Sequence, residues 1–234
     1  MKVGLIDYSC NVDHEDLIGQ VTVETGQQIF TQPSGVIDPE HGTAVFGEIL
    51  AADNGFGITG IAPEATGIFY PCVSINGRGR AASAILSAGD SLSVGDVLCL
   101  PLELGGAPFW TSSTYGTLLS TVADLGITTF TAAGNGGYNV TGGTGVTTIT
   151  VGACWPGRQL PLPIDDSLTI PGPAYPGDAY CRSSNSNYSS DGSIVTAGWG
   201  SAVCTLGYGT LFREDGTPNR NYIQSFSGTS AATG

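Results

Sequence analysis

The sequence predicts an α/β fold of three layers, in which a mostly parallel β-sheet carries helices on both faces. Apolar, strand-like runs alternate with helix-like stretches along most of the chain, and this alternation is typical of a parallel sheet with crossover helices. A chain of 234 residues is long enough for one domain with a sizeable core. Charged residues make up only 12% of the chain and glycine occupies 36 positions, which indicates many tight turns and close backbone approaches.

The alternating segments can be placed individually. We expect strands over residues 3–6, 66–73, 96–100, 127–132, 147–153 and 193–197. We expect helices over residues 41–51, 79–92 and 115–125. Residues 155–192 are rich in Pro, Gly, Ser and Asp without periodicity, so they are predicted to be surface loops within one domain spanning residues 1–234.

Two titratable residues stand at the ends of predicted elements. Asp7 closes the apolar run 3–6, and the carboxyl tip of a buried strand is where open α/β sheets build their sites. His41 begins a predicted helix, whose N-terminus disfavours imidazolium and so keeps a histidine in the neutral form that a general base requires. Taken singly, Asp7 also fits a strand-end cap and His41 a core histidine.

Ser230 lies between small residues in the segment 227–233, at what is predicted to be the tight entry to a helix. A nucleophilic hydroxyl needs small neighbours and backbone N–H groups that face the developing anion. The same residues also fit an ordinary turn and helix start. Acid, base and nucleophile nevertheless follow each other in the order Asp, His, Ser, which is the order found in subtilisin.

The chain resembles the subtilisin-like serine proteases in five separate segments. They are the acid segment (5–7 with 13–17), the histidine motif (41–43), the loop and strand after the histidine helix (54–63), the asparagine segment (131–135) and the serine motif (225–231). These segments cover almost the whole chain and follow the family's order. The resemblance implies a subtilisin-like fold and a serine endopeptidase.

The resemblance also implies a role for each site residue. Ser230 would attack a peptide carbonyl after giving its proton to His41, and Asp7 would hold the imidazole in the required tautomer. Asn135 would donate its side-chain N–H to the oxyanion, together with the Ser230 backbone N–H. Read alone, Asn135 in Gly-Asn-Gly-Gly is a turn residue.

The expected partner is a polypeptide substrate, which binds as an added extended strand in this family. By resemblance, one wall of the primary pocket comes from the segment 100–106 and the facing wall from 132–134. The first wall departs from the family's Ser-Leu-Gly: one register uses Leu102, and another uses Leu104 and Gly105 at the cost of an insertion. The facing wall would be formed by Ala132, Ala133 and Gly134.

Charge and hydropathy exclude other classes of partner. A net charge of −13, with only seven Lys and Arg, argues against nucleic-acid binding. No apolar run approaches the roughly 18 residues of a membrane span. We therefore expect an acidic monomer. The one expected cofactor is a structural calcium at the loop 52–57, with Asn54 as a ligand, although the loop also fits a plain Asn-Gly turn.

Six cysteines allow 15 full pairings. Cys72 and Cys99 lie in apolar segments and are expected to be buried thiols. Cys154, Cys181 and Cys204 lie in the loop-rich last third and are the better disulfide candidates. This pattern and the resemblance favour secretion, although no signal peptide precedes the first strand.

Other interpretations stay open. In the family the serine opens a long buried helix, whereas only four residues follow Ser230, so we expect the C-terminal helices to be missing. The chain is then either a fragment of a protease or a catalytically inactive module that acts as a binding or scaffold domain. A sedolisin-type acid peptidase would need Glu as base and Asp in place of Asn135. A different acyl hydrolase would need a Gly-x-Ser-x-Gly elbow, which is absent. His14 is expected to be an exposed loop residue.

Overall fold

The computed structural model describes residues 1–24, 38–74, 79–155, 182–194, 196–213 and 216–234. Its centre is a seven-stranded sheet with the order β2-β3-β1-β4-β7-β8-β9, in which all neighbouring strands are parallel. The strands are β1 (Lys2–Asp7), β2 (Val21–Val23), β3 (Thr66–Pro71), β4 (Val97–Leu100), β7 (Thr128–Ala132), β8 (Ile149–Cys154) and β9 (Thr196–Trp199).

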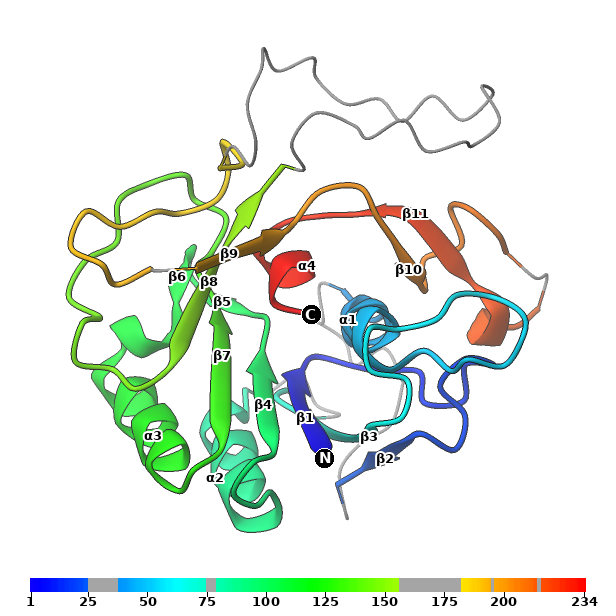
Figure 1. Ribbon diagram of the computed structural model, residues 1–234, viewed down its shortest axis with the longest axis horizontal. Coiled ribbons are helices and arrows are strands. Elements are labelled where there is room, and N and C mark those ends of the chain that lie inside the picture. The colour runs from blue at the N-terminus through cyan, green and yellow to red at the C-terminus, as the bar shows by residue number, and fades with distance from the viewer. Residues whose placement is uncertain (25–37, 75–78, 156–181, 195, 214–215) are drawn as a thin grey trace.

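Helices cover both faces of this sheet (Figure 1). On one face lie α2 (Ala81–Ser91) and α3 (Ser113–Asp124), and on the other lie α1 (His41–Leu50) and the short α4 (Thr229–Thr233). An antiparallel hairpin of β10 (Val203–Leu206) and β11 (Tyr222–Phe226) packs against α1. Smaller elements are β5 (Glu103–Leu104), β6 (Ala107–Pro108), η1 (Phe109–Thr111) and η2 (Pro218–Arg220).

The two faces of the sheet build two separate hydrophobic cores. Because successive side chains of a strand point to opposite faces, Leu5 of β1 packs toward Phe46 of α1 and Ile6 packs toward Ile85 of α2. All four of these side chains are fully buried. Burial on both faces explains why β4 and the middle of β1 are continuous apolar runs.

The predicted fold class is confirmed, and most predicted elements begin and end within two residues of their observed bounds. The strand expected over 193–197 is instead β9, which begins three residues later, at Thr196. The hairpins β5–β6 and β10–β11 and the edge strand β2 were not predicted, because two to five residues are too short to show a period. Of the predicted loop region 155–192, residues 182–192 contain no helix or named strand, and residues 156–181 lie outside the described residues.

The parallel order brings the carboxyl ends of β1, β4 and β7 to the same edge of the sheet. Asp7, Pro101 and Ala133 stand at or just beyond these strand ends. Within the described ranges, the model has no helix that is both long and apolar enough to cross a membrane.

Candidate active site

Asp7 and His41 form a buried, hydrogen-bonded pair. Asp7 is the last residue of β1 and is fully buried, and His41 is the first residue of α1. The distance from His41 Nδ1 to Asp7 Oδ2 is 2.7 Å. Because a carboxylate only accepts hydrogen bonds, Nδ1 carries the proton and Nε2 is left as a free base.

The local sequence explains how the helix start comes so close to the strand end. A Cβ atom on Gly42 would lie 2.5 Å from the Ser9 carbonyl oxygen and 3.1 Å from Asp7 Cβ, so only glycine fits there. One residue further, Thr43 Oγ1 accepts a hydrogen bond of 2.8 Å from the Asn11 backbone N–H. This bond ties the first turn of α1 to the loop that follows β1.

Burial and the Asp7 carboxylate act on His41 in opposite directions. Burial disfavours the imidazolium, but the charge and hydrogen bond of Asp7 outweigh it and raise the pKa of His41. Burial, followed by the charge of Asp7, also raises the pKa of the adjacent Tyr8 to about 12. Both shifts show a carboxylate acting in a poorly solvated environment.

Ser230 is the second residue of α4, and Gly228 turns the chain into this helix. Gly228 has a φ of 109°, a backbone conformation that favours glycine. Ser230 is buried, and its Oγ donates a hydrogen bond of 2.6 Å to the carbonyl oxygen of Pro101. α4 contacts α1, and the ring of Phe226 lies 5.5 Å from the ring of His41.

The serine and the histidine are therefore in neighbouring elements, but they are not hydrogen-bonded. In the described part of the chain, the hydrogen bond of the Ser230 hydroxyl goes to Pro101 and none joins it to His41. The structure thus forms one of the two hydrogen bonds that a catalytic triad uses.

Asn135 contacts Thr229, the residue before Ser230. Its Oδ1 accepts hydrogen bonds from the backbone N–H and the hydroxyl of Thr229, at 2.9 and 3.2 Å. Its backbone N–H and its Nδ2 both donate to Oε2 of Glu103, at 2.7 and 3.2 Å. The bonds from Thr229 fix the orientation of the amide, because only Oδ1 accepts.

The two predicted substrate walls face each other and are tied together by Asn187. Its buried Nδ2 donates to the carbonyl oxygens of Gly106 and Ala133, at 2.6 and 2.8 Å. Leu102, Ala132 and Ala133 have their side chains in the core, with at most 3% exposed. Gly105 lies in the turn of the β5–β6 hairpin with a φ of 61°, whereas Leu104 is exposed. Gly134 follows Ala133 and packs close to Gly106.

Two residues of this region were missed from the sequence. Glu103 is the one carboxylate in the wall segment 100–106, and this contrast with its apolar neighbours was a readable signal. Asn187 stands in a run of serine and asparagine residues that gives no such signal.

The expectation for His14 was wrong. Its side chain is completely buried, with Nε2 2.9 Å from the carbonyl oxygen of Asn221 and Nδ1 accepting from the Asp16 backbone N–H. Burial lowers the pKa of His14. Both ring nitrogens are used, so His14 is a structural residue and no rival base.

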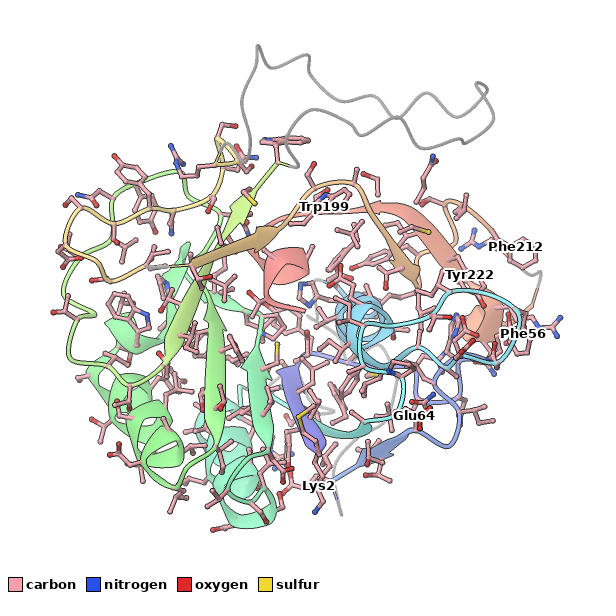
Figure 2. The ribbon with its side chains drawn as sticks, viewed as in Figure 1. Lys2, Phe56, Glu64, Trp199, Phe212 and Tyr222 are labelled. Atoms are coloured by element: carbon pink, nitrogen blue, oxygen red, sulfur yellow. The ribbon has the colours of Figure 1, made fainter. Side chains whose placement is uncertain are left out.

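The loop proposed to bind calcium lies beside Tyr222, and Phe56 marks its tip (Figure 2). Asn54 Oδ1 accepts from the Phe56 backbone N–H, and Asn54 Nδ2 donates to Asp16. The Asn54 oxygen is thus used in a turn, and the described residues contain no group of three or more His, Cys, Asp or Glu suited to a metal. Calcium binding at this loop stays a prediction, which a comparison of melting temperatures with and without a chelator would test.

The predicted disulfides find no support among the described cysteines. Cys154 and Cys204 are free thiols, as are the buried Cys10, Cys72 and Cys99. Burial raises the pKa of each of these thiols, most strongly in the three last named. Cys181 lies outside the described residues.

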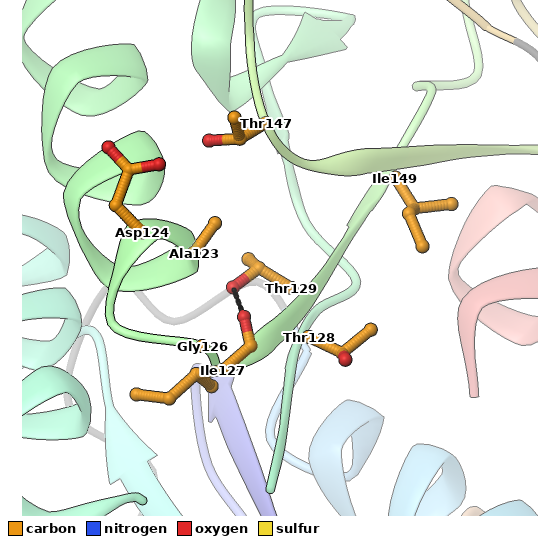
Figure 3. Close-up of a pocket in the computed structure, with 8 residues that line it drawn as sticks. All are labelled: Ala123, Asp124, Gly126, Ile127, Thr128, Thr129, Thr147 and Ile149. Carbon is orange, nitrogen blue, oxygen red and sulfur yellow. Dashed lines mark hydrogen bonds between the residues drawn. The ribbon is translucent and has the colours of Figure 1, made fainter. Parts of the chain in front are cut away.

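A shallow cavity of about 290 Å³ lies away from this site (Figure 3). It is lined by the end of α3 and the beginnings of β7 and β8, including Asp124, Thr128 and Ile149. These strand beginnings are at the edge of the sheet opposite to Asp7, so the cavity has no part in the site.

Comparison with known proteins identifies the family of this chain. The model of the subtilase family, Peptidase_S8, matches residues 1–234. The chain belongs to the subtilase family. This subtilase is 31% identical to subtilisin DY of Bacillus licheniformis over 144 residues, which are 58% of the chain and 48% of that protein. It is 34% identical to an intracellular serine protease of Paenibacillus polymyxa over 87 residues, 34% of the chain and 26% of that protein.

Solved structures show the same fold. A cold-adapted subtilisin-like serine proteinase superposes with a TM-score of 0.64 at 20% identity, covering 99% of this subtilase and 70% of that chain. The protease domain of PatA superposes with a TM-score of 0.66 at 20% identity, covering 100% of this subtilase and 74% of that chain.

The alignment covers about half or less of the length of each curated relative. The Paenibacillus protein is named as intracellular, as is the major intracellular serine protease of Bacillus subtilis, which is 38% identical over 72 residues (28% of the chain and 22% of that protein). These relatives give no support to the prediction of secretion.

Proposed function

We propose that this subtilase is a serine endopeptidase that cleaves polypeptides through Asp7, His41 and Ser230. The observation that carries the proposal is the buried 2.7 Å hydrogen bond between Asp7 and His41. It orients the ring and leaves Nε2 unprotonated, on a helix that contacts the helix of the one serine in the Gly-Thr-Ser motif.

The proposed reaction begins when Ser230 Oγ gives its proton to His41 Nε2 and attacks the carbonyl carbon of the scissile bond. Asp7 stabilises the imidazolium that forms. His41 then returns the proton to the leaving amine, the C–N bond breaks, and an acyl-Ser230 ester remains. Water attacks the ester with His41 again as base, which releases the acid and restores Ser230.

The oxyanion of the tetrahedral intermediate would accept hydrogen bonds from Asn135 Nδ2 and from the Ser230 backbone N–H. Thr229 holds the Asn135 side chain beside the start of α4 through two hydrogen bonds to Oδ1, and Nδ2, which bonds Glu103 with one N–H, keeps a second N–H for the oxyanion. The peptide would bind as an extended strand beside the segments 100–106 and 132–135.

The Ser230 hydroxyl must leave Pro101 before it can react. Rotation about a single side-chain torsion would move Oγ from one staggered position to another, which requires no change in the backbone. A substrate strand that approaches Pro101 would compete for its carbonyl oxygen and so favour this rotation.

A second candidate function is a catalytically inactive binding module. The observation that favours it is that Ser230 Oγ bonds Pro101 and Asn135 Nδ2 bonds Glu103, so both proposed reactive groups are engaged by the protein itself. A module of this kind would keep the fold and the Asp7–His41 pair without activating the serine.

Covalent labelling separates the two candidates. The endopeptidase proposal predicts that a fluorophosphonate adds one phosphonyl group, located on Ser230 by peptide mass spectrometry. Ser230→Ala should remove labelling and His41→Ala should slow it by several orders of magnitude, because no other base can take the proton.

The matched control is a substitution at the second histidine. His14→Gln keeps a donor and an acceptor for the groups that His14 contacts, and it should label at the wild-type rate per folded molecule. An unlabelled wild type with a cooperative melt would instead support the inactive module.

A further inference from the structure

Glu103 places a carboxylate directly against the proposed oxyanion donor. The residue is half-buried in β5, and both of its hydrogen bonds, from Asn135 N and Nδ2, go to Oε2. Oε1 accepts no hydrogen bond from the described part of the chain. The two ion pairs found there are His41–Asp7 and Arg220–Glu15, so Glu103 has no cationic partner among these residues.

The other carboxylates near the site are already engaged. Asp7 bonds His41 and accepts from the Tyr8 backbone N–H, and Asp38 accepts a 2.6 Å hydrogen bond from the Tyr208 hydroxyl. Glu103 is therefore the carboxylate that contacts Asn135 and keeps one oxygen, Oε1, available for a further hydrogen bond.

The negative charge of Glu103 would repel the oxyanion of the proposed reaction unless a positive charge lies nearby. The amide of Asn135 has two N–H groups, so one can bond Glu103 while the other bonds the oxyanion. Two acceptors on one such amide lie about 5 Å apart. At an effective dielectric constant near 20, repulsion between two negative charges at this distance slows the reaction by roughly 10²-fold.

We propose that Glu103 is a specificity-determining residue that selects a cationic side chain, lysine or arginine, on the residue whose carbonyl Ser230 attacks. The cation would bond Oε1 and cancel the charge of Glu103 beside the oxyanion. The chain itself offers few cations for this purpose, with seven Lys and Arg in 234 residues. This inference rests on the proposed endopeptidase function.

The first test compares two peptide anilides that differ only in arginine or its neutral isostere citrulline before the scissile bond. The wild type should cleave the arginine substrate with a kcat/KM about 10- to 100-fold higher. Glu103→Gln, which keeps an oxygen for Asn135, should reduce this ratio to within about threefold and should cleave the citrulline substrate faster than the wild type does.

The matched control is Glu64→Gln, the same substitution at an exposed carboxylate on a distant loop (Figure 2). It should leave the ratio unchanged, which excludes a general effect of net charge. A wild-type ratio below about threefold, or a high ratio that survives Glu103→Gln, would overturn the inference while leaving the endopeptidase proposal intact.

The second test measures binding without catalysis. Benzamidinium is a planar cation, and its dissociation constant can be measured by titration of the Ser230→Ala variant with and without Glu103→Gln. We expect Glu103→Gln to weaken binding at least tenfold, even if no substrate is hydrolysed and the endopeptidase proposal fails. Equal dissociation constants in the two variants would refute the role of Glu103.

Discussion

The two halves of the candidate site differ in what their polar atoms contact. In the acid–base half, Asp7 and His41 bond each other at 2.7 Å, in the arrangement that the proposed reaction requires. In the nucleophile–oxyanion half, Ser230 bonds Pro101 and Asn135 bonds Glu103, and the Ser230 hydroxyl must leave Pro101 before it can react.

The two halves differ because one is completed by groups of the protein and the other by the substrate. Both partners of the acid–base half are protein groups on rigid elements, so the half is complete in the free protein. The partner of the other half is a substrate carbonyl, and without it the hydroxyl and the amide satisfy themselves with nearby backbone and carboxylate oxygens. Substitutions in the two halves should therefore give different signatures.

The largest expected effect comes from Asp7→Asn. The amide would no longer favour the Nδ1-protonated tautomer, so turnover of a peptide anilide should fall by roughly 10⁴-fold, the size of this change in other serine proteases. Adding Ser230→Ala should cost little more than Ser230→Ala alone, because the three residues act as a unit. Additive losses would mean that Asp7 and Ser230 do not belong to one site.

The same substitution should reverse the shift of the His41 pKa. Asp7 raises that pKa above its usual value of about 6.5, so the activity of the wild type should be lost as the pH falls through the raised pKa. Without Asp7, burial is opposed only by the smaller effect of the Asp38 charge, and the pKa of His41 should fall below 6.5, as measured by NMR titration of the imidazole.

The raised pKa also has a consequence for stability. The folded protein binds this proton more tightly than the unfolded chain, so the stabilisation is present in full below pH 6.5 and is lost as the pH rises through the folded value. A His41 pKa that Asp7→Asn leaves unchanged would contradict this account.

An intermediate effect is expected from Asn135→Ala. Turnover should fall by about 10²- to 10³-fold with a small change in KM, a range that is known from subtilisin itself. Asn139→Ala, the same change four residues along at an exposed asparagine, should leave turnover unchanged. A loss that appeared only in KM would assign Asn135 to substrate binding instead.

The smallest expected effect is a change in stability on substitution of Glu48, which lies near the C-terminal end of α1. Glu48 is 9% exposed, and its two carboxylate oxygens have no partner among the described residues. Burial raises the pKa of Glu48 well above the usual value of 4.5, so its contribution to stability is intact below pH 4.5 and declines as the pH rises through the folded value.

Glu48→Met should therefore raise the melting temperature by a few degrees at pH 8 and by much less at pH 4.5, at roughly 2–4 °C per kcal/mol for a chain of this size. The control Glu64→Met alters an exposed carboxylate and should show no such pH-dependent gain. A destabilised Glu48→Met at pH 8 would show that the carboxylate has a partner that stabilises its charge.

The sheet and its helices were predictable because the central strands are buried on both faces. Apolar runs such as residues 3–6 and 97–100 have no other stable place in a chain of this length. The hairpin β10–β11 was not predictable, since its strands pair across a long loop and are only four and five residues long.

The acid–base half of the site was also predictable, because Asp7 and His41 stand at element ends that parallel topology brings together. The contacts of Glu103 and Asn187 were not, since both side chains reach across loops whose conformation no periodicity describes. The prediction that His14 is exposed failed for a related reason. Its charged neighbours Asp13 and Glu15 indicate a solvent-exposed segment, whereas the His14 side chain contacts the backbone of Asn221, which is distant in the sequence.

The position of β1 in the middle of the sheet has a consequence for how the protein is made. Asp7 stands in β1 and Ser230 in α4, and α4 packs against β7, β8 and β9, so these strands must join β1 in the sheet before the two residues meet. Such distant contacts form slowly and late in folding. The proposed centre can therefore cut only after the sheet that carries Asp7 has formed and α4 has packed against it.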